Sequence, residues 1–169
     1  MPNTSAIYDF LRDAHVPYGV MPHRPAFTAQ EEAAATHVPG RNWAKVVVCL
    51  VDGEPVQAVL PATTTVNLDL LLELTGGNEI RLAEENELSQ LFPDCEPGAM
   101  PPFGPLYGQA VFVDASLAAE PDIVFNGGTH MDAILMRWAD FANTVSPIVG
   151  KFAEPASARP VDFRLSYWE

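Results

Sequence analysis

Apolar residues recur at helical spacing in several segments of the chain, and three of these segments start at a Ser, Thr or Asn that can cap a helix. The pattern predicts helices over residues 4–14, 28–37, 68–74 and 84–92. Residue pairs that contain proline or glycine end the first three, at Val16-Pro17, Pro39-Gly40 and Gly76-Gly77.

Runs of apolar and β-branched residues predict the strands. Residues 45–51 are almost continuously apolar, which is typical of a strand covered on both faces, and Asp52-Gly53 turns the chain into a second strand over 56–60. Further extended segments are expected over 18–21, 80–82, 110–113 and 123–125. Because helices and strands interleave irregularly, we expect an α/β fold of the mixed α+β kind, with a curled mixed sheet or partial barrel and helices packed outside it.

Two segments interrupt this pattern, the first rich in proline and glycine and the second in glycine alone. They are residues 93–105, too punctuated for a regular element, and the Asn-Gly-Gly-Thr-His corner at 126–130. No repeat or linker divides the chain, so residues 1–154 are expected to form one domain. Residues 155–169 differ in texture and are interpreted as a C-terminal tail that docks on the domain, with a partner-binding arm or a disordered segment as alternatives.

Composition narrows the possible partners. With 169 residues, 48% of them hydrophobic, the chain can form one packed core and is expected to be soluble. The net charge of −13 argues against general attraction to phosphates, so a nucleic acid would need a local cationic pocket, and DNA is not expected as a partner. No stretch approaches the roughly 20 apolar residues of a membrane span. The N-terminus resembles no signal peptide, so we expect a cytoplasmic protein without a membrane partner.

Lys45 is one of only two lysines and stands at the start of the apolar strand over 45–51. One interpretation is a strand-end lysine whose stem covers the core while its head stays in water. The other is a point charge directed at a phosphate or a developing oxyanion.

The two irregular segments also have two interpretations each. Residues 97–105 could be a rigid connector, but Gly98 and Gly104 would also let backbone amides approach a bound group. The corner at 127–130 has the composition of a backbone nest for an anionic oxygen, with His130 at its edge. A tight turn followed by a partly buried histidine explains it equally well.

Metal and cofactor chemistry has little support in the sequence. His23, His37 and His130 are scattered, and Cys49 and Cys95 do not have the spacing of a zinc site. The sequence has no Gly-x-Ser-x-Gly elbow, no phosphate-binding loop and no dinucleotide fingerprint. We therefore expect no metal and no cofactor, and any catalysis should activate water.

Several short motifs, taken in order, resemble one family. They are His23 with Thr28 and Glu31-Glu32-Ala33-Ala34, Lys45, Asn67-Leu68-Asp69, Arg81-Leu82-Ala83, Glu96-Pro97-Gly98 to Pro102-Phe103-Gly104, and Asn126-Gly127-Gly128-Thr129-His130. Their order and spacing over residues 5–150 resemble the YbaK/prolyl-tRNA-synthetase-associated domain. The tail beyond Pro155 is not covered.

The resemblance implies a relative of the editing domain of bacterial prolyl-tRNA synthetases, which hydrolyses the ester between a wrong amino acid and tRNA without a metal. It implies that Lys45, beside the terminal adenosine and its phosphate, and His130 act in catalysis. Substrate-binding residues would be His23, Thr28, Gly98, Pro102, Gly127, Gly128 and Thr129. It also implies a strand near 130–136 and a helix from Trp138, although residues 131–145 have helical periodicity throughout.

The expected function is therefore a trans-acting aminoacyl-tRNA deacylase that uses an oriented water or the ribose hydroxyl. Alanine on proline tRNA is the first expected substrate and cysteine the second. The loop Ala99-Met100-Pro101-Pro102 is denser in proline than is usual in the family, which would alter the pocket. The expected partners are the acceptor end of mischarged tRNA and a synthetase, prolyl-tRNA synthetase first. Alternatives are a non-catalytic module that binds tRNA or a synthetase, and a hydrolase of another activated small ester.

Overall fold

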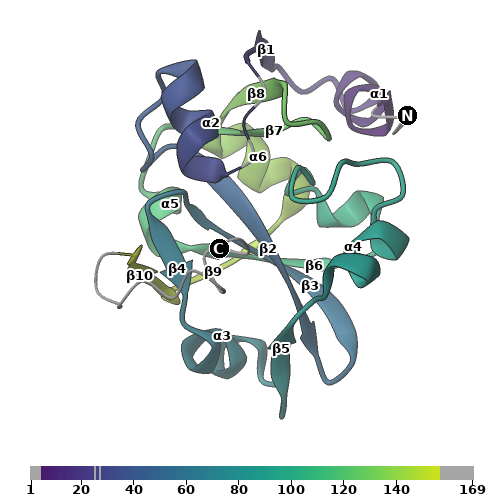
Figure 1. Ribbon diagram of the computed structural model, residues 1–169, viewed down its shortest axis with the longest axis vertical. Helices are drawn as coiled ribbons and strands as arrows, with labels where there is room; N and C mark the ends of the chain where they lie inside the picture. The colour runs from purple at the N-terminus through teal and green to yellow at the C-terminus, as the bar shows by residue number, and fades with distance from the viewer. Residues whose placement is uncertain (1–4, 25, 27, 157–169) are drawn as a thin grey trace.

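The computed structural model describes residues 5–24, 26 and 28–156, and Figure 1 shows how their helices and strands are arranged. The helices are α1 (Ser5–Asp13), α2 (Ala29–Thr36), α3 (Leu68–Thr75), α4 (Glu85–Leu91), the 3-10 helix η1 (Gly104–Leu106), α5 (Ala115–Ala118) and α6 (Trp138–Val145). The strands are β1 (Gly19–Pro22), β2 (Ala44–Val51), β3 (Glu54–Pro61), β4 (Thr64–Val66), β5 (Ile80–Leu82), β6 (Ala110–Asp114), β7 (Asp122–Asn126), β8 (Asp132–Arg137), β9 (Ile148–Gly150) and β10 (Ala153–Pro155). From residue 157 on, the expected tail lies outside the described residues.

The largest sheet has five strands in the order β5-β2-β3-β6-β9. β2 and β3 form the predicted antiparallel hairpin, with Val51 opposite Glu54 across the two-residue turn. β3 then pairs in parallel with β6, and β6 in parallel with β9, so the sheet is mixed. In Figure 1, β2 and β3 run through the middle of the molecule, with α3 and β5 below them and α1 and α2 above.

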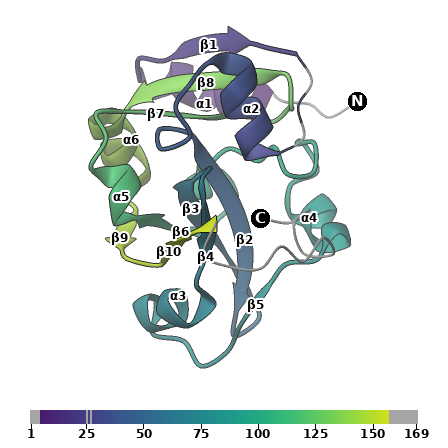
Figure 2. The ribbon, with the colours of Figure 1, turned by 60° about the vertical axis from the view of Figure 1, so that its left-hand side comes forward.

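Two smaller sheets complete the fold. β1, β8 and β7 form an antiparallel sheet with β8 in the middle, and β4 pairs with β10. A bridge between Trp43 and Val124 joins β7 to the residue before β2. Figure 2 shows the three-stranded sheet at one end of the molecule with α2 beside it. The fold is thus the expected mixed α/β class with helices outside the sheets, and its described strands do not close into a barrel.

The elements begin close to the positions that the hydrophobic pattern predicted, and the change from strand to helix at Trp138 agrees with the family resemblance instead of the pattern. Residues 132–137 form β8 despite their helical periodicity because β8 is the middle strand, and Ile134 lies opposite both Val20 and Phe125. The pattern did not predict β4, α5, β9 and β10, which have three or four residues each. Elements this short carry no readable periodicity and depend on distant pairing partners.

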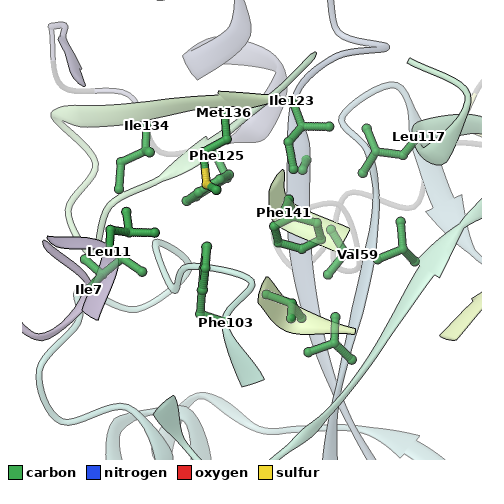
Figure 3. Packing of buried hydrophobic residues seen from close by; sticks show 14 residues of the cluster. Ile7, Leu11, Val59, Phe103, Leu117, Ile123, Phe125, Ile134, Met136 and Phe141 are labelled. Atoms are coloured by element: carbon green, nitrogen blue, oxygen red, sulfur yellow. The ribbon is translucent and has the colours of Figure 1, made fainter. Parts of the chain in front are cut away.

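The principal core lies between the two larger sheets and includes one residue of the proline-rich segment. Phe103 is fully buried, with its ring 5.4 Å from that of Phe125 and 5.5 Å from that of Phe141. Figure 3 shows Phe103 pointing into the same cluster as these two rings. Burial of a phenylalanine is worth about 2–3 kcal/mol, so the segment is anchored to the fold at this position.

The helices are short, α1 being the longest with nine residues. Two of the predicted caps are present, since Thr28 Oγ1 accepts a hydrogen bond from the Glu31 amide at 3.1 Å and Asn67 Oδ1 accepts one from the Leu70 amide at 3.0 Å. Each cap is worth about 1 kcal/mol. The cap predicted for the first helix lies outside the described residues. In the described part of the chain, no helix has the length and apolar character needed to cross a membrane.

Candidate functional site

A cavity of about 370 Å³ lies at the edge of β2 that faces β5. β5 pairs with β2 only along Cys49–Val51, so the first half of β2 has no pairing with β5 on this edge. The lining residues come from β2, from β5 and the residue after it, from α4 and from the proline-rich segment: Val46, Val47, Val48, Leu82, Ala83, Glu85, Leu88, Pro97, Gly98 and Met100. Glu85 is the one charged residue among them, so the cavity is mostly apolar, as small-molecule sites usually are.

The register of the hairpin decides which backbone groups of β2 face this cavity. In a two-residue hairpin the flanking residues, here Val51 and Glu54, hydrogen-bond each other, and every second residue of β2 therefore bonds to β3. Val46 and Val48 point their N–H and C=O groups toward the other edge. The Ala83 amide donates to the Val48 carbonyl at 2.9 Å. Val46 lies two residues before Val48 in β2, so its amide points toward the same edge, where the cavity lies.

The proline-rich segment forms another wall of the cavity and is fixed at several positions. Besides the buried Phe103, the Tyr107 hydroxyl donates to the Asp94 carboxylate at 3.3 Å, and the Tyr107 ring packs against Phe92 at 4.6 Å. Cys95 Sγ lies 3.4 Å from the Tyr107 hydroxyl, and burial raises the pKa of this thiol to about 12. Cys95 therefore stays protonated and supports the segment instead of acting as a nucleophile.

The proline-rich segment is hydrogen-bonded to the glycine corner. The Glu96 amide donates to the Gly128 carbonyl at 2.8 Å, the Gly128 amide donates to the Ala99 carbonyl at 3.1 Å, and the His130 amide donates to Glu96 Oε2 at 3.0 Å. The Gly127 amide donates to a carbonyl of β8 at 3.2 Å. The corner is therefore not the ligand-binding nest that its composition suggested, because these amides already donate to protein acceptors.

His130 is 7% exposed and engages both of its ring nitrogens. Nε2 lies 2.7 Å from the Pro97 carbonyl oxygen, and Nδ1 lies 2.6 Å from Glu32 Oε1. A carbonyl oxygen can only accept, so Nε2 carries a proton. Glu32 is 1% exposed. The ring thus connects a buried carboxylate of α2 to the backbone of the cavity wall.

The electrostatics of this pair favour a charged histidine. Burial alone would lower the pKa of His130, but the hydrogen bonds to Glu32 and to the Pro97 carbonyl outweigh it and raise that pKa. Burial raises the pKa of Glu32, while hydrogen bonds from His130 and Asn126 act in the opposite direction. The two groups share one proton between Nδ1 and Oε1, since one of two atoms 2.6 Å apart has to donate. With both nitrogens bonded, His130 is arranged to hold its neighbours and not to accept a proton from water.

Of the expected Gly-x-x-x-Pro pair, Gly98 borders the cavity and Pro102 does not. Gly98 has φ +82°, a conformation that L side chains rarely adopt, and a Cβ placed there would lie 3.5 Å from Cε1 of His130. Pro102 is buried and is not one of the cavity-lining residues. Its expected contact with the aminoacyl group is therefore not supported by this geometry, because Pro97 and Met100 occupy that side of the cavity instead.

Lys45 lies opposite Leu60 in the hairpin and is 8% exposed. This low exposure leaves little of the Lys45 side chain in contact with water. By strand alternation Lys45 shares a face of β2 with Val47, which lines the cavity, although Lys45 itself does not. The lysine is thus placed beside the cavity, on the same strand that supplies three of its lining residues.

The remaining predicted site residues lie outside the cavity lining. The His23 amide donates to the Met131 carbonyl at 2.8 Å, and its Nδ1 donates to the Arg24 carbonyl at 2.8 Å. Thr129 Oγ1 accepts from the Met131 amide at 3.3 Å. Thr28 caps α2. His23 also acts on the pair described above, since its charge lowers the pKa of Glu32.

Sequence reasoning did not single out Glu32 as a functional residue. One signal was available: Glu31 and Glu32 are adjacent, and a helix start needs at most one of them as its N3 partner. The structure uses Glu31 at the exposed start of α2 and buries Glu32 beside Ala33. Among the described residues, no group of three or more His, Cys, Asp or Glu side chains is arranged to hold a metal ion.

Comparison with known proteins gives a family and several similar structures. A family model described as the aminoacyl-tRNA editing domain matches residues 23–144. The hypothetical protein APE2540 has 20% sequence identity and a TM-score of 0.80, over 88% of this chain and 99% of that one. A candidate trans-editing enzyme for prolyl tRNA synthetase has 19% identity and a TM-score of 0.78, over 91% and 98%.

A third structure, a candidate signal transduction protein from Marinobacter aquaeolei VT8, has 16% identity and a TM-score of 0.70. The match covers 90% of this chain but 31% of that one, so the fold also occurs as part of a longer protein. At these identities the structures establish the shared fold alone. No curated protein matches the chain.

Proposed function

The chain belongs to the aminoacyl-tRNA editing domain family, and we propose that it hydrolyses the ester of mischarged tRNA in trans. The observation that carries this proposal is the apolar cavity at the edge of β2, walled by the segment that His130 holds in place. Every residue that lines the cavity lies inside the family match over residues 23–144.

The chemistry needs little from the protein because an aminoacyl ester is already activated. The oxygen of a water molecule attacks the ester carbonyl carbon, and the bond from that carbon to the ribose oxygen breaks. The ribose oxygen takes one proton of the water, the other goes to solvent, and the amino acid leaves as a carboxylate. A mostly apolar cavity that excludes bulk water and orients one water, directly or through the ribose hydroxyl, supports this reaction without a metal.

The developing negative charge on the carbonyl oxygen needs a donor, and the amide of Val46 is our candidate. This amide points toward the cavity, two residues before Val48, whose carbonyl accepts the hydrogen bond from Ala83. The amides of Gly127, Gly128 and His130 already donate within the protein. An oxyanion donor therefore comes from the edge of β2, and preorganised donors of this kind contribute about 3–4 kcal/mol to catalysis.

Lys45 supplies the positive charge near this edge, and we assign it to the terminal phosphate and adenosine of the tRNA. His130 holds the Pro97 carbonyl in place, and with it Gly98, the next residue of the cavity wall. Gly127, Gly128 and Thr129 form the corner that leads to His130. His23 and Thr28 lie on the same side, at the segment that leads into α2. Because of these positions, the proposed site retains five further residues: His23, Thr28, Gly127, Gly128 and Thr129.

The substrate side chain should be small and apolar. The cavity is lined by valine, leucine, alanine and methionine side chains, with Met100 on the wall formed by the proline-rich segment. We propose alanine esterified to proline tRNA as the first substrate and cysteine as the second. One methylene in an apolar pocket is worth about 1–3 kcal/mol, so the preference should be graded and not absolute.

The deciding experiment is a substrate panel. The purified protein is incubated with proline tRNA charged with alanine, cysteine, serine or proline, and ester loss is followed against a no-enzyme control. We expect alanine to be removed fastest and proline to remain attached. If no member of the panel is hydrolysed, at enzyme concentrations where an established editing domain is active, the deacylase proposal is wrong and a non-catalytic binding module is favoured. Free aminoacyl esters serve as competitors and report whether the tRNA is needed.

A synthetase is the partner that this function would require. One similar structure is described as a candidate trans-editing enzyme for prolyl tRNA synthetase, and we propose that this chain binds that synthetase. Size-exclusion chromatography of the protein with purified prolyl-tRNA synthetase, with and without tRNA, tests it. A complex that forms while deacylation is absent would support the binding-module alternative.

A further inference from the structure

We propose that Glu32 is a positioning residue of this site, which sets the protonation and orientation of His130 and through it the place of Pro97 and Gly98 at the cavity wall. This inference rests on the proposed deacylase function. Nothing in the family resemblance gives Glu32 a role.

The connection runs through two contacts of the His130 ring and the chain that follows them. Glu32 Oε1 lies 2.6 Å from Nδ1 of His130, and Nε2 of the same ring lies 2.7 Å from the Pro97 carbonyl. The next residue, Gly98, lines the cavity, and a Cβ there would lie 3.5 Å from Cε1 of His130. A displacement of the imidazole would therefore move the backbone that borders the substrate.

The proton inventory explains why a carboxylate stands at this position. The Pro97 carbonyl requires a proton on Nε2, so a neutral ring would turn an unprotonated Nδ1 toward Glu32. If Glu32 remains ionised, two electron-rich atoms then face each other in a buried site. A protonated ring removes this conflict, since Nδ1–H donates to the carboxylate and Nε2–H donates to the carbonyl. Glu32 thus keeps both donors of His130 in use.

The other charged and polar groups near the pair either raise the pKa of His130 or lower the pKa of Glu32. From the proline-rich segment, Glu96 accepts from the His130 amide at 3.0 Å and its charge raises the pKa of His130. From the chain after β1, His23 lowers the pKa of Glu32, and from β7 Asn126 does so as well. The arrangement is therefore most stable while His130 is protonated, which is at pH values below its raised pKa.

The sign of the pH effect follows from this. A histidine whose pKa is raised by folding contributes stability that is fully present below its unfolded pKa and is lost as pH rises through the folded value. The wild-type protein should lose deacylase activity on the alkaline side. In Glu32→Gln, the side-chain amide can donate to Nδ1 of a neutral ring, so the Nε2–H bond to Pro97 persists and this alkaline decline should disappear.

The test compares Glu32→Ala and Glu32→Gln with Glu31→Gln, which changes the adjacent, exposed carboxylate of the same helix. For Glu32→Ala we expect kcat to fall about 10- to 100-fold with a smaller change in KM, as is typical of a displaced catalytic wall. Glu32→Gln should stay within about threefold of wild type at neutral pH, and Glu31→Gln should match wild type in rate and pH profile. Enzyme-catalysed rates are taken net of spontaneous ester hydrolysis, with folded fractions measured for each variant.

An NMR measurement keeps the inference testable apart from catalysis. In protein labelled with ¹⁵N-histidine, the His130 ring should show two protonated nitrogens in the wild type and the neutral Nε2–H form in Glu32→Gln. If the panel shows no deacylation but these ring states are found, the proposed function fails and the positioning role stands. If Glu32→Ala retains wild-type kcat, if its loss merely equals its unfolded fraction, or if the wild-type ring is neutral, the inference is wrong.

Discussion

At the scale of single residues, burial determines what each polar group can do. Lys45 and His130 are both basic side chains that are less than one-tenth exposed. Both ring nitrogens of His130 are committed to Glu32 and Pro97. Lys45 is placed on β2 beside the cavity, where a positive charge in partly desolvated surroundings acts strongly on a nearby phosphate. Although both are basic side chains, their proposed roles therefore differ: Lys45 interacts with a phosphate and His130 positions its neighbours.

Removal of the Lys45 charge should impair deacylation. For Lys45→Met, which keeps most of the stem, we expect kcat/KM to fall about 100-fold, because the charge on the tRNA end or the transition state is no longer balanced. Steady-state rates on alanyl-tRNA of the proline type measure this. Lys151→Ala is the matched control, since Lys151 is the other lysine and is exposed. Equal rates for the two variants would place the active site elsewhere.

At the scale of elements, β2 and the proline-rich segment create the site between them. β2 is paired along its whole length with β3 but only at its end with β5, so part of its edge is available. The proline-rich segment has no long helix or strand and is fixed by Phe103 in the core and by hydrogen bonds to the glycine corner. An open strand edge facing a rigid, irregular wall is a common way to expose backbone donors to a ligand.

The role of the strand edge can be tested with proline at position 46. The Val46 amide points away from β3, so Val46→Pro removes a donor that the ladder does not use. We expect kcat to fall about 10²–10³-fold, the usual loss for one oxyanion donor. Val46→Ala, which keeps the amide, should lose much less. If both variants are equally active and equally well folded by thermal melting, Val46 is not the donor.

At the scale of the whole molecule, charge limits how tRNA can be held. A net charge of −13 leaves no basis for broad contact with the phosphate backbone. Contact confined to the acceptor end fits both this charge and the local position of Lys45. It also gives a reason for the proposed synthetase partner, which would add contacts to the tRNA.

The salt dependence of tRNA binding should reflect this limited contact. The slope of log affinity against log salt should correspond to about one to three phosphates, far fewer than for a basic RNA-binding domain. Fluorescence anisotropy of labelled tRNA over a range of salt concentrations measures it. A steep slope would mean that a larger part of the tRNA is bound and that the acidic surface does not govern recognition.

The sequence by itself determined most of the longer elements and, among the cavity-lining residues, singled out Gly98. Caps such as Thr28 and Asn67, the turn at Asp52-Gly53 and the runs of valine act within a few residues, so their effect can be read without the fold. The same holds for the order of motifs that identified the family, now supported by the match over residues 23–144.

Only the tertiary structure decided how these parts work together. Glu32 meets His130, and Gly128 meets Glu96, across long stretches of chain, and no periodicity encodes such contacts. Pro102 matched the motif yet is buried away from the cavity, while the Val46 amide became available because β5 is short. Short elements such as β4 and β10 likewise depend on each other. Local sequence sets the conformation of each segment, whereas hydrogen-bond partners and burial arise only when distant segments pack.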